Sequence, residues 1–503
     1  MSILTSNFEQ LPYVERFLSH LETMNEFLSP RAILRYQLEI LQTGGFALPS
    51  PWTGKLLRPV DCYVANNSPL GFGDIVIAYR LQCEETVWVI AGIVKEGFPI
   101  NEVFIPALDV SPWYLHPDTE ALNENMRGHL RFVDDPGRQG PAEAPVLLLG
   151  HPNFAHTIWN ELPGLAALRL FKTECVDNLQ VMTLCQPILD YEEEFSDLGF
   201  EHCTVRDVTD VLGLQPRVFT RIGSTQVTEL LRTTLLKSLR RGRNSSITCA
   251  VERQLEHRNP VVWVSVRLDS RTASNQEEFV VAAITAIAAH YPAAAFILDG
   301  FSFPNDFDNP IYRQSCGAQI DGATLGIQAG SVSSLGEMLA AREREVSAYI
   351  VGLQQALTRK FRNPVVSTSG LNMTDATYIG SLAHYYVCHA GTLQHKIGWV
   401  HNSAGIVHSN TEGVGAGAAG WMAKQVENGL LPAVIDQSLI HNLSSIRSLN
   451  QVERNRDYQI ADVTAAVSQV MNGLAQRMSE PGSGYSNRST PDWRPESTDN
   501  PVR

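Results

Sequence analysis

The chain has 503 residues, of which 44% are hydrophobic and 18% charged, and its formal net charge is −14. This length exceeds what one hydrophobic core supports, so we expect two or three domains. The acidic balance argues against a protein built to hold a nucleic acid backbone, which requires a basic face.

Two regions are expected before the first α/β domain. Residues 1–50 are predicted to contain helices, because apolar residues recur at helical spacing from Leu11 to Leu21. Residues 51–140 are predicted to form a β-rich region, because short strand-like runs such as Ile75 to Tyr79 alternate with turn residues.

Alternating strand and helix patterns then predict two α/β domains with parallel sheets. The first, residues 141–245, begins with the buried apolar run from Val146 to Gly150. The second, residues 255–475, begins with the run from Pro260 to Val266. The basic, polar stretch from Arg240 to Ser246 is expected to connect them, and residues 476–503 have the composition of a disordered tail.

The first polar constellation follows the strand that ends at Leu149. His156 and Glu161 are candidate catalytic groups, because an imidazole and a carboxylate at the carboxyl edge of a sheet suit acid–base work. His151, Asn153 and Asn160 are candidates for binding an acceptor. Alternatively, His156 and Glu161 only cap and solvate a helix end. A metal site is a further reading, but the spacing matches no standard zinc pattern.

The second constellation follows the strand that ends near Val266. Arg267 and Arg271 are expected to bind a diphosphate, because a guanidinium group matches phosphate oxygens in two-point contacts. Asn275 is expected at the start of the next helix, close to the same ligand. The alternative is that both arginines are exposed and pair with nearby glutamates.

The third constellation is a strand, a small-residue turn and a helix start, which together can hold an anion at the helix N-terminus. Its candidate contacts to a phosphate-bearing ligand are His389, Gly391, Thr392, His395 and Lys396. In an open α/β sheet ligands bind beyond the carboxyl ends of the strands, where this turn would lie. An ordinary turn with a solvated lysine is the alternative.

Together these motifs resemble glycosyltransferase family 61 and the wider GT-B clan. The residues that carry the resemblance are Asn153, His156, Glu161, Leu162 and Pro163 in the first constellation, Ser265, Arg267, Arg271, Asn275, Glu277 and Glu278 in the second, and His389 to Leu393 in the third. Order and coarse spacing agree over roughly half the chain. The third turn has its small residues in a different order, and Arg267 lies one place from the family's Ser-Arg.

The resemblance implies an α/β fold of GT-B type, with two Rossmann-type domains facing a cleft. It further implies transfer of a sugar from a nucleotide-diphosphate sugar to a hydroxyl of a glycan or another acceptor. The implied context of this transfer is polysaccharide or glycoconjugate biosynthesis. With basic groups to neutralise the leaving diphosphate, we expect no metal and no cofactor beyond the nucleotide-sugar co-substrate.

Three rival interpretations remain. Gly415, Gly417 and Gly420 fit G-x-G-x-x-G, which is typical of an NAD(P)-dependent oxidoreductase, although they begin several residues after the preceding strand. Asp306 and Asp308 match the Asp-x-Asp of metal-dependent sugar transferases. A non-catalytic sugar-binding or scaffold protein could keep the same fold.

The cellular context is predicted from absences in the sequence. No stretch approaches the ~20 apolar residues of a membrane span, and the N-terminus lacks a signal-peptide pattern, so we expect a cytoplasmic protein without a transmembrane segment. The eight cysteines form no CxxC pair, which favours reduced thiols and no structural zinc.

Overall fold

The structure is a computed structural model of the chain. It describes residues 8–29, 32–66, 75–92, 97–114, 127, 130, 145–151, 153–174, 179–199, 201–204, 218–268, 271–308, 335–415, 417, 420, 424–446 and 455–480.

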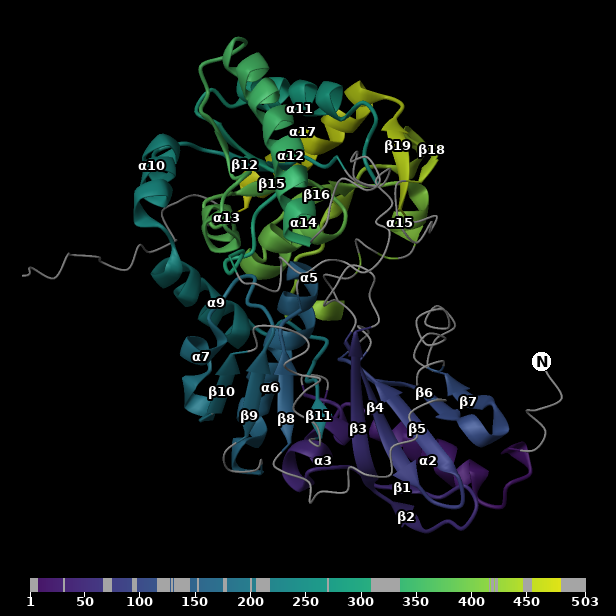
Figure 1. Cartoon of the computed structure of the whole chain (residues 1–503). Helices are drawn as coiled ribbons and strands as arrows, with labels where there is room; N and C mark the ends of the chain where they lie inside the picture. Colours follow the sequence, from purple (N-terminus) through teal and green to yellow (C-terminus); the bar gives the residue numbers. More distant parts are fainter. Residues whose placement is uncertain are drawn as a thin grey trace, which may run out of the picture.

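The N-terminal part consists of two helices and an antiparallel sheet (Figure 1). The helices are α2 (Val14–Met24) and α3 (Arg35–Thr43), and a short pair, β1 (Leu48–Pro49) and β2 (Leu56–Leu57), follows. The sheet is a meander of β3 (Pro59–Asn66), β4 (Ile75–Gln82), β5 (Thr86–Ala91), β6 (Ile100–Ile105) and β7 (Val110–Tyr114). The helical and β-rich regions predicted from the sequence are both present.

The first α/β domain contains a four-stranded, entirely parallel sheet. Its strands are β8 (Val146–Leu149), β9 (Gln180–Thr183), β10 (Glu201–Thr204) and β11 (Phe219–Thr220), in the order β10-β9-β8-β11. Its helical elements are α5 (Phe154–His156), a π-helical turn (Thr157–Glu161), α6 (Leu162–Leu168), α7 (Tyr191–Glu194) and α9 (Glu229–Gly242).

The second α/β domain contains a six-stranded parallel sheet in the order β14-β13-β12-β15-β16-β17. Its strands are β12 (Val261–Ser265), β13 (Ala295–Asp299), β14 (Val365–Ser367), β15 (Tyr385–His389), β16 (Gly405–His408) and β17 (Ala433–Val434). Its helical elements are α11 (Gln276–His290), α12 (Leu335–Thr358), α13 (Met373–Gly380), α14 (Thr392–Gln394), a second π-helical turn (His395–Trp399), α15 (Thr411–Gly415) and α17 (Val463–Ser479). An antiparallel pair, β18 (Ile440–Ile446) and β19 (Arg456–Ile460), completes it.

Alternating side chains bury both faces of each parallel sheet. In β8, Val146 packs with the N-terminal helices and meander, whereas Leu147 packs with α6 and α9. In β12, Val262 packs against α11, α12 and α17, whereas Trp263 joins the same core as Leu147. Neighbouring residues face opposite sides of a sheet because the strand period is two. The hydrophobic core that contains Leu147 and Trp263 continues from the first α/β domain into the second.

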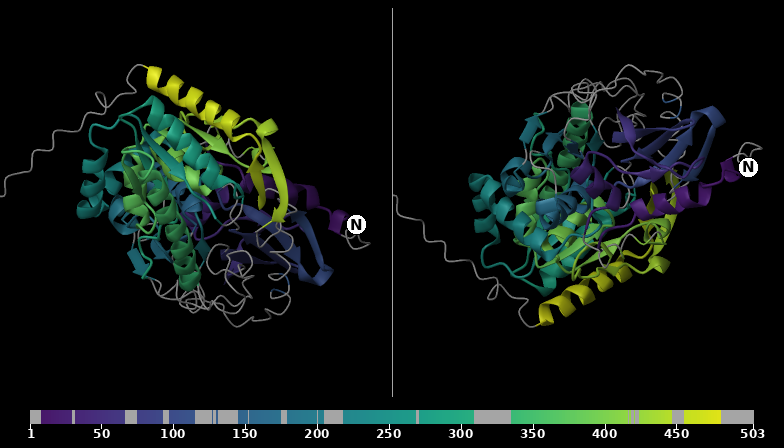
Figure 2. Two further views of the ribbon diagram at one scale, coloured as in Figure 1. Left: turned by 90° about the horizontal axis from the view of Figure 1, so that it is seen from above. Right: turned by 90° about the horizontal axis from the view of Figure 1, so that it is seen from below.

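The carboxyl edges of the two sheets face each other. Figure 1 shows α5, which follows β8, at the junction between the domains, with α14 of the second domain nearby. Figure 2 shows α17 on the outer side of the second domain, next to α11. The predicted fold class, two Rossmann-type domains facing each other in the GT-B manner, is confirmed by these strand pairings.

The stretch from Arg240 to Ser246, predicted to connect the domains, ends α9 and begins α10 (Ser245–Leu255), which lie between β11 of the first sheet and β12 of the second. The predicted tail begins later than expected, since α17 extends to Ser479; residues 481–503 lie outside the described residues. No helix among the described residues is long and apolar enough to cross a membrane.

Candidate active site

Strand order places the site at the reversal point of each sheet. Numbered along the chain, the strands of the second sheet run 3-2-1-4-5-6, the Rossmann order, and those of the first sheet run 3-2-1-4. Ligands of such sheets bind beyond the carboxyl ends of the strands where this order reverses. That point lies between β12 and β15 in the second domain, and between β8 and β11 in the first.

Each α/β domain carries a π-helical turn. In the first domain it follows the first strand of the sheet, β8, and in the second domain it follows the fourth strand, β15. The turns are Thr157–Glu161 and His395–Trp399, and their indoles Trp159 and Trp399 meet edge to face with 6.1 Å between ring centroids. Single π-helical turns are rare and occur often at functional sites. The sequence predicted ordinary helices here, because the hydrophobic pattern does not distinguish the two.

Glu161 closes the turn after β8 and does not face a ligand. Its fully buried carboxylate accepts hydrogen bonds from the amides of Gly150 and His151 and pairs with Arg221 Nη2 at 2.9 Å. Gly150 has φ 104°, and a Cβ there would lie 2.4 Å from the amide nitrogen of Cys185. The prediction of Glu161 as base or as partner of His156 is therefore corrected: it is a buried structural carboxylate.

The partner of His156 is instead Asn160. Nδ1 of His156 lies 3.2 Å from Asn160 Oδ1, while Asn160 Nδ2 donates to the carbonyl of Ser224. Because an amide oxygen only accepts, His156 carries its proton on Nδ1 and presents Nε2 as an acceptor. Burial lowers the pKa of His156 to about 4, so the ring is neutral at pH 7.

The other predicted acceptor contacts in this turn differ in position. Asn160 is fully buried, so it orients His156 and does not reach an acceptor. His151 is also buried, its ring centroid 4.7 Å from that of His156, and its Nδ1 accepts from the amide of Asn153. Asn153 is exposed and caps α5 through Oδ1, so a contact with an acceptor stays a prediction for this residue.

At the reversal point of the second sheet, Ser265 holds His389. Ser265 Oγ accepts the backbone N–H of His389 and lies 3.1 Å from His389 Nδ1. The hydroxyl either donates to Nδ1, which leaves the ring proton on Nε2, or accepts from Nδ1–H. In both tautomers Nε2 is buried and has no hydrogen-bond partner among the residues that the structure describes.

Arg271 lies over the turn that follows β15. Its φ of 54° is in the left-handed region, and a Cβ on Gly391 would lie 3.0 Å from its Nη1. Gly391 itself has φ 115°, so both its conformation and the guanidinium above it require a glycine. A non-glycine residue held at positive φ is a conformation found preferentially at ligand sites.

Arg267 follows β12 and lies close to His389. The side chain of Gln276 accepts a hydrogen bond from the backbone N–H of Arg267 and donates one to the carbonyl oxygen of Arg267. These two bonds fix the backbone just after β12, from which the Arg267 side chain extends. Burial first, and then the charges of His408, Arg267 and Arg271, hold the pKa of His389 well below its usual range. Of the predicted diphosphate contacts Arg267, Arg271 and Lys396, the two arginines thus lie close to His389. Their binding of a diphosphate stays a prediction.

Lys396 does not join this group as predicted. Its ammonium bonds Asp299 Oδ1 at 2.9 Å, Ser302 Oγ at 2.9 Å and the carbonyl of Gly300 at 3.3 Å. An ammonium has three donors, and all three are engaged. Burial raises the pKa of Asp299, and the charge of Lys396 opposes that shift. Lys396 therefore fixes the loop after β13. The prediction that it binds phosphate is corrected: it is the partner of Asp299 in a buried ion pair.

Asn275 is likewise engaged by the protein. Its Nδ2 donates to the carbonyl of Ile460 and its Oδ1 accepts the amide of the same residue, so it fastens β19 to the start of α11. A nucleotide contact from Asn275 is corrected to this role. Thr392 begins α14, but its side chain lies outside what the structure describes. The helical run that α14 begins continues through the π-helical turn, so the predicted helix start after the turn at Gly391 is present.

His395 brings the second domain to the first. Its ring stacks on Trp399 with 3.5 Å between centroids. Burial first, and then the proximity of His156 and Arg271, holds the pKa of His395 well below its usual range. Its Nδ1 is buried without a hydrogen-bond partner among the described residues. The candidate base of one domain and the candidate phosphate contacts of the other therefore lie in one site.

Sequence reasoning missed several residues of this site. His408 ends β16 beside His389, with 4.3 Å between ring centroids, and its Nδ1 lies 2.6 Å from the hydroxyl of Tyr458 on β19. His408 could have been found, because it directly follows the short apolar run Ile406 and Val407, as His389 follows its own apolar run. Tyr458 and Arg221 carry no such signal, since only the tertiary fold brings them here.

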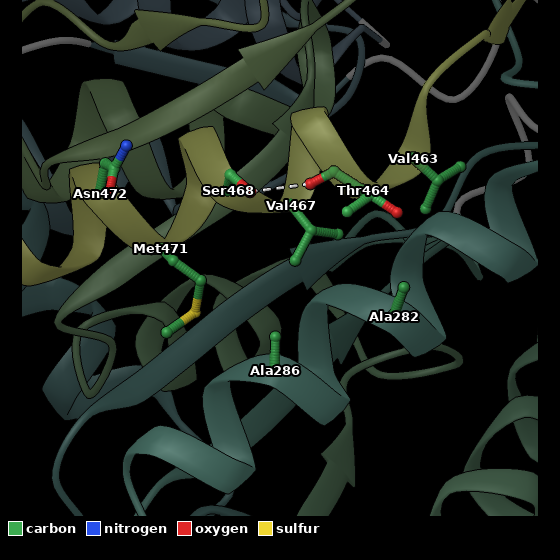
Figure 3. Close-up of a pocket in the computed structure, with 8 residues that line it drawn as sticks. All are labelled: Ala282, Ala286, Val463, Thr464, Val467, Ser468, Met471 and Asn472. Carbon is green, nitrogen blue, oxygen red and sulfur yellow. Dashed lines mark hydrogen bonds between the residues drawn. The ribbon is translucent and has the colours of Figure 1, made fainter.

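A cavity of about 210 Å³ lies between the domains, next to this cluster. Arg267, Lys396 and Arg342 of α12 line it, with Phe154 of the first domain on its wall. A larger cavity of about 360 Å³ lies on the outer side, between α11 and α17 (Figure 3). Its lining, which includes Ala286 and Met471, contains no titratable side chain, so it has no group for acid–base or phosphate chemistry.

The rival motifs do not have the geometry that they require. Gly415 ends α15, so the glycines do not form the turn directly after a strand that a dinucleotide fingerprint needs. Asp306 Oδ2 accepts the amide of Gln186, which connects the loop to the first domain. Within the described part of the chain, no three His, Cys, Asp or Glu side chains gather as metal ligands.

Comparison with known proteins gives only remote similarity. No protein-family model and no curated protein matches the sequence. ADP-heptose LPS heptosyltransferase II from E. coli is 10% identical with a TM-score of 0.32, covering 66% of this chain and 99% of its own. Trehalose 6-phosphate synthase from Burkholderia multivorans is 8% identical with a TM-score of 0.29, covering 64% and 67%. UDP-GlcNAc 2-epimerase from Neisseria meningitidis is 11% identical with a TM-score of 0.25, covering 72% and 83%.

At this level of similarity no function is transferred from these proteins. The fold assignment rests on the strand order and pairing within this chain. The resemblance to glycosyltransferase family 61 stays a prediction from the sequence motifs.

Proposed function

We propose that this protein is a glycosyltransferase that moves a sugar from a nucleotide-diphosphate sugar to a hydroxyl group of an acceptor. The observation that carries the proposal is the pairing of two unlike groups across the domains. Arg267, Arg271 and His389 offer N–H donors and positive charge at the reversal point of one sheet, and a neutral His156 lies at that of the other.

Each group has a role in the transfer. His156 Nε2 accepts the proton of the acceptor hydroxyl, whose oxygen then forms a bond to the anomeric carbon. The bond from that carbon to the diphosphate oxygen breaks, and the diphosphate leaves with the electron pair. The two guanidinium groups and His389 Nε2–H stabilise the negative charge that develops on the leaving group. No metal ion is needed for this charge balance.

The test begins with binding. A panel of nucleotide sugars is screened for thermal stabilisation, because a ligand at ~100 times its dissociation constant adds about 2.7 kcal/mol to the free energy of unfolding. Binding should weaken in Arg271→Ala and stay unchanged in Arg253→Ala, an arginine on the surface of α10.

Turnover then separates the enzyme from a silent sugar-binding protein. The donor that binds is incubated with a panel of hydroxyl acceptors, and release of nucleoside diphosphate is measured with and without acceptor. Acceptor-dependent release is expected. Binding without any release in the presence of acceptors would instead favour the non-catalytic alternative, and absence of binding by every nucleotide sugar would overturn the proposal.

A further inference from the structure

The N-terminal region reaches the candidate active site through one loop. Phe98 is fully buried and has φ 61°, in the left-handed region. Its carbonyl accepts a hydrogen bond from the hydroxyl of Tyr36, and the carbonyl of Gly97 accepts one from the side chain of Gln37 at 2.6 Å. Both donors are buried residues of α3. Such a conformation in a non-glycine residue persists only where the surrounding structure fixes it, and α3 does so here.

This loop contacts the segment that follows β11. The guanidinium of Arg221 lies over the Phe98 ring, with 4.0 Å from Cζ to the ring centroid. A Cβ on Gly223 would lie 2.7 Å from the same ring, so a side chain there would displace it. Gly164 of α6 approaches the segment as closely, because a Cβ on it would lie 2.9 Å from Cα of Gly223. Residues 221–225 therefore contact both the N-terminal loop and the helix that follows the π-helical turn of the first domain.

The same segment holds that π-helical turn. The backbone N–H of Ser224 donates to the carbonyl of Asn160 at 3.1 Å, and Asn160 Nδ2 donates to the carbonyl of Ser224 at 3.4 Å. Trp159 Nε1 donates to the carbonyl of Thr225 at 3.2 Å. Asn160 Oδ1 in turn lies 3.2 Å from His156 Nδ1. The orientation of the His156 ring thus depends on where the segment lies.

Arg221 acts on His156 by its charge as well. Burial lowers the pKa of His156 to about 4, the hydrogen bond with Asn160 opposes that shift, and the charge of Arg221 adds to it. The guanidinium is held in place by Glu161, whose Oε1 lies 2.9 Å from Nη2. Arg221 therefore connects the N-terminal loop to the candidate base by both packing and charge.

We propose that Phe98 is a positioning residue for sugar transfer, because it holds Arg221 and, through it, keeps His156 Nε2 directed at the acceptor hydroxyl. A general base acts only within hydrogen-bond reach of the proton that it removes, so its orientation limits the rate. The N-terminal region is then part of the catalytic apparatus. This inference rests on the proposed function, and it adds to that site a residue from outside both α/β domains.

The experiment compares Phe98→Leu with Phe17→Leu in the full chain. Phe17 of α2 is equally buried and packs in the N-terminal core against Phe8. Each change removes one buried ring, so the melting temperature should fall in both. We expect Phe98→Leu to lower kcat roughly 10- to 100-fold, the scale of a misplaced catalytic group, with donor affinity unchanged. Phe17→Leu should keep the kcat of the unchanged protein.

The imidazole itself reports its orientation without turnover. Nitrogen-15 NMR near neutral pH distinguishes which ring nitrogen carries the proton, and the signal of His156 is identified by its loss in His156→Ala. We expect the Nδ1–H form in the unchanged protein and in Phe17→Leu, because Nδ1–H donates to Asn160 Oδ1. Phe98→Leu should give a mixture of both tautomers, since that contact is loosened.

Arg221→Lys tests the route from Phe98 to His156, and it carries the test alone if Phe98→Leu does not fold. Lysine keeps the charge but lacks the planar group that lies on the ring, so kcat should fall as in Phe98→Leu. The double variant should lose no more than the stronger single variant, because both changes act through one contact.

The outcomes separate the two proposals. Unchanged kcat and an unchanged tautomer in Phe98→Leu and Arg221→Lys, or additive losses in the double variant, overturn the positioning role and leave the proposed function intact. If the unchanged protein turns over no nucleotide sugar, the proposed function fails, while the NMR comparison still decides whether Phe98 orients the ring.

Discussion

Ser265 at the end of β12 and His389 at the end of β15 are joined twice, by the backbone N–H of His389 to Ser265 Oγ at 2.9 Å and by the 3.1 Å contact of Oγ with Nδ1. Two neighbouring parallel strands thereby fix one imidazole at the reversal point of the sheet, and its buried Nε2 has no hydrogen-bond partner among the described residues. With the Ser265 hydroxyl donating to Nδ1, Nε2–H is a donor for a phosphate oxygen.

The first prediction tests that donor. His389→Ala should weaken nucleoside diphosphate binding by ~1.5–3 kcal/mol, the range for a hydrogen bond to a charged group, and Ser265→Ala by the smaller ~0.5–1.5 kcal/mol of an ordinary hydrogen bond. Calorimetric titration measures both. Ser274→Ala, an exposed serine before α11, is the control. Unchanged affinity in His389→Ala would contradict a phosphate contact.

The second prediction concerns the buried pair of Lys396 and Asp299. Lys396→Met should cost about 3–5 kcal/mol of the free energy of unfolding, because it leaves Asp299 buried without its counter-charge. The double variant with Asp299→Asn should recover much of that loss, since no uncompensated charge remains. Urea denaturation measures the three proteins. A Lys396→Met protein of normal stability but weakened nucleotide binding would restore Lys396 as a ligand.

The third prediction is a loss of stability in mild acid. Burial holds the pKa of His389 and His395 well below 6.5 and lowers that of His408 to about 3, so the folded state keeps these rings neutral. The unfolded chain protonates them below about pH 6.5 and then binds more protons than the folded state. Stability from these groups is therefore complete above that pH and decreases as the pH falls, by about 1.4 kcal/mol per pH unit for each histidine.

Denaturation midpoints between pH 8 and pH 5 measure this slope. His395→Phe, which keeps an aromatic ring against Trp399, should make the slope shallower by one histidine's share. His257→Gln, an exposed histidine after α10, should not change it. A pH-independent stability in this interval would contradict neutral, buried rings.

The sequence predicted those parts of the fold that depend on local pattern. The apolar runs from Val146 and from Pro260 contain β8 and β12, and the strand of the third constellation is β15. The candidate residues at the carboxyl edges followed from the same pattern. β11, with two residues, is too short for any periodicity to indicate it.

Roles that depend on tertiary partners could not be predicted. Lys396 and Asp299 are 97 residues apart, and Glu161 and Arg221 are 60 apart, so their pairing is set only by the packed fold. In both cases a charged residue that was expected to face a ligand instead forms a buried salt bridge with another residue of the protein. A buried charge must be paired, and the sequence does not say with which group.

The fourth prediction is that activity does not need a divalent metal ion. Arg267 and Arg271 supply the positive charge at the leaving diphosphate, and Asp306, the candidate metal ligand, accepts the amide of Gln186. Turnover measured in EDTA should equal turnover with added Mg²⁺ or Mn²⁺. Activity that disappears in EDTA and returns with Mn²⁺ would favour the Asp306 and Asp308 reading instead.

The last prediction concerns His156 as general base. His156→Ala should lower kcat by ~10²–10⁴, the usual contribution of general base catalysis, while donor affinity is unchanged. Glu161→Gln is a different case, because it breaks the buried pair with Arg221 and should reduce stability. A folded Glu161→Gln protein that loses turnover, beside a fully active His156→Ala, would reverse the two roles.

The pH profile distinguishes a base from a residue that only supports the turn. With its pKa lowered to about 4, His156 should lose activity through protonation only near that pH, and not near the 6.5 of a free imidazole. Asn160→Asp places a negative charge 3.2 Å from Nδ1 and favours the imidazolium, so the acid limb of kcat/KM should move to higher pH. Asn160→Ala removes the partner without adding charge and is the matched control for that shift. If the acid limb stays where it is in Asn160→Asp, the group that titrates is not His156, and the base must be sought among other side chains of the cleft.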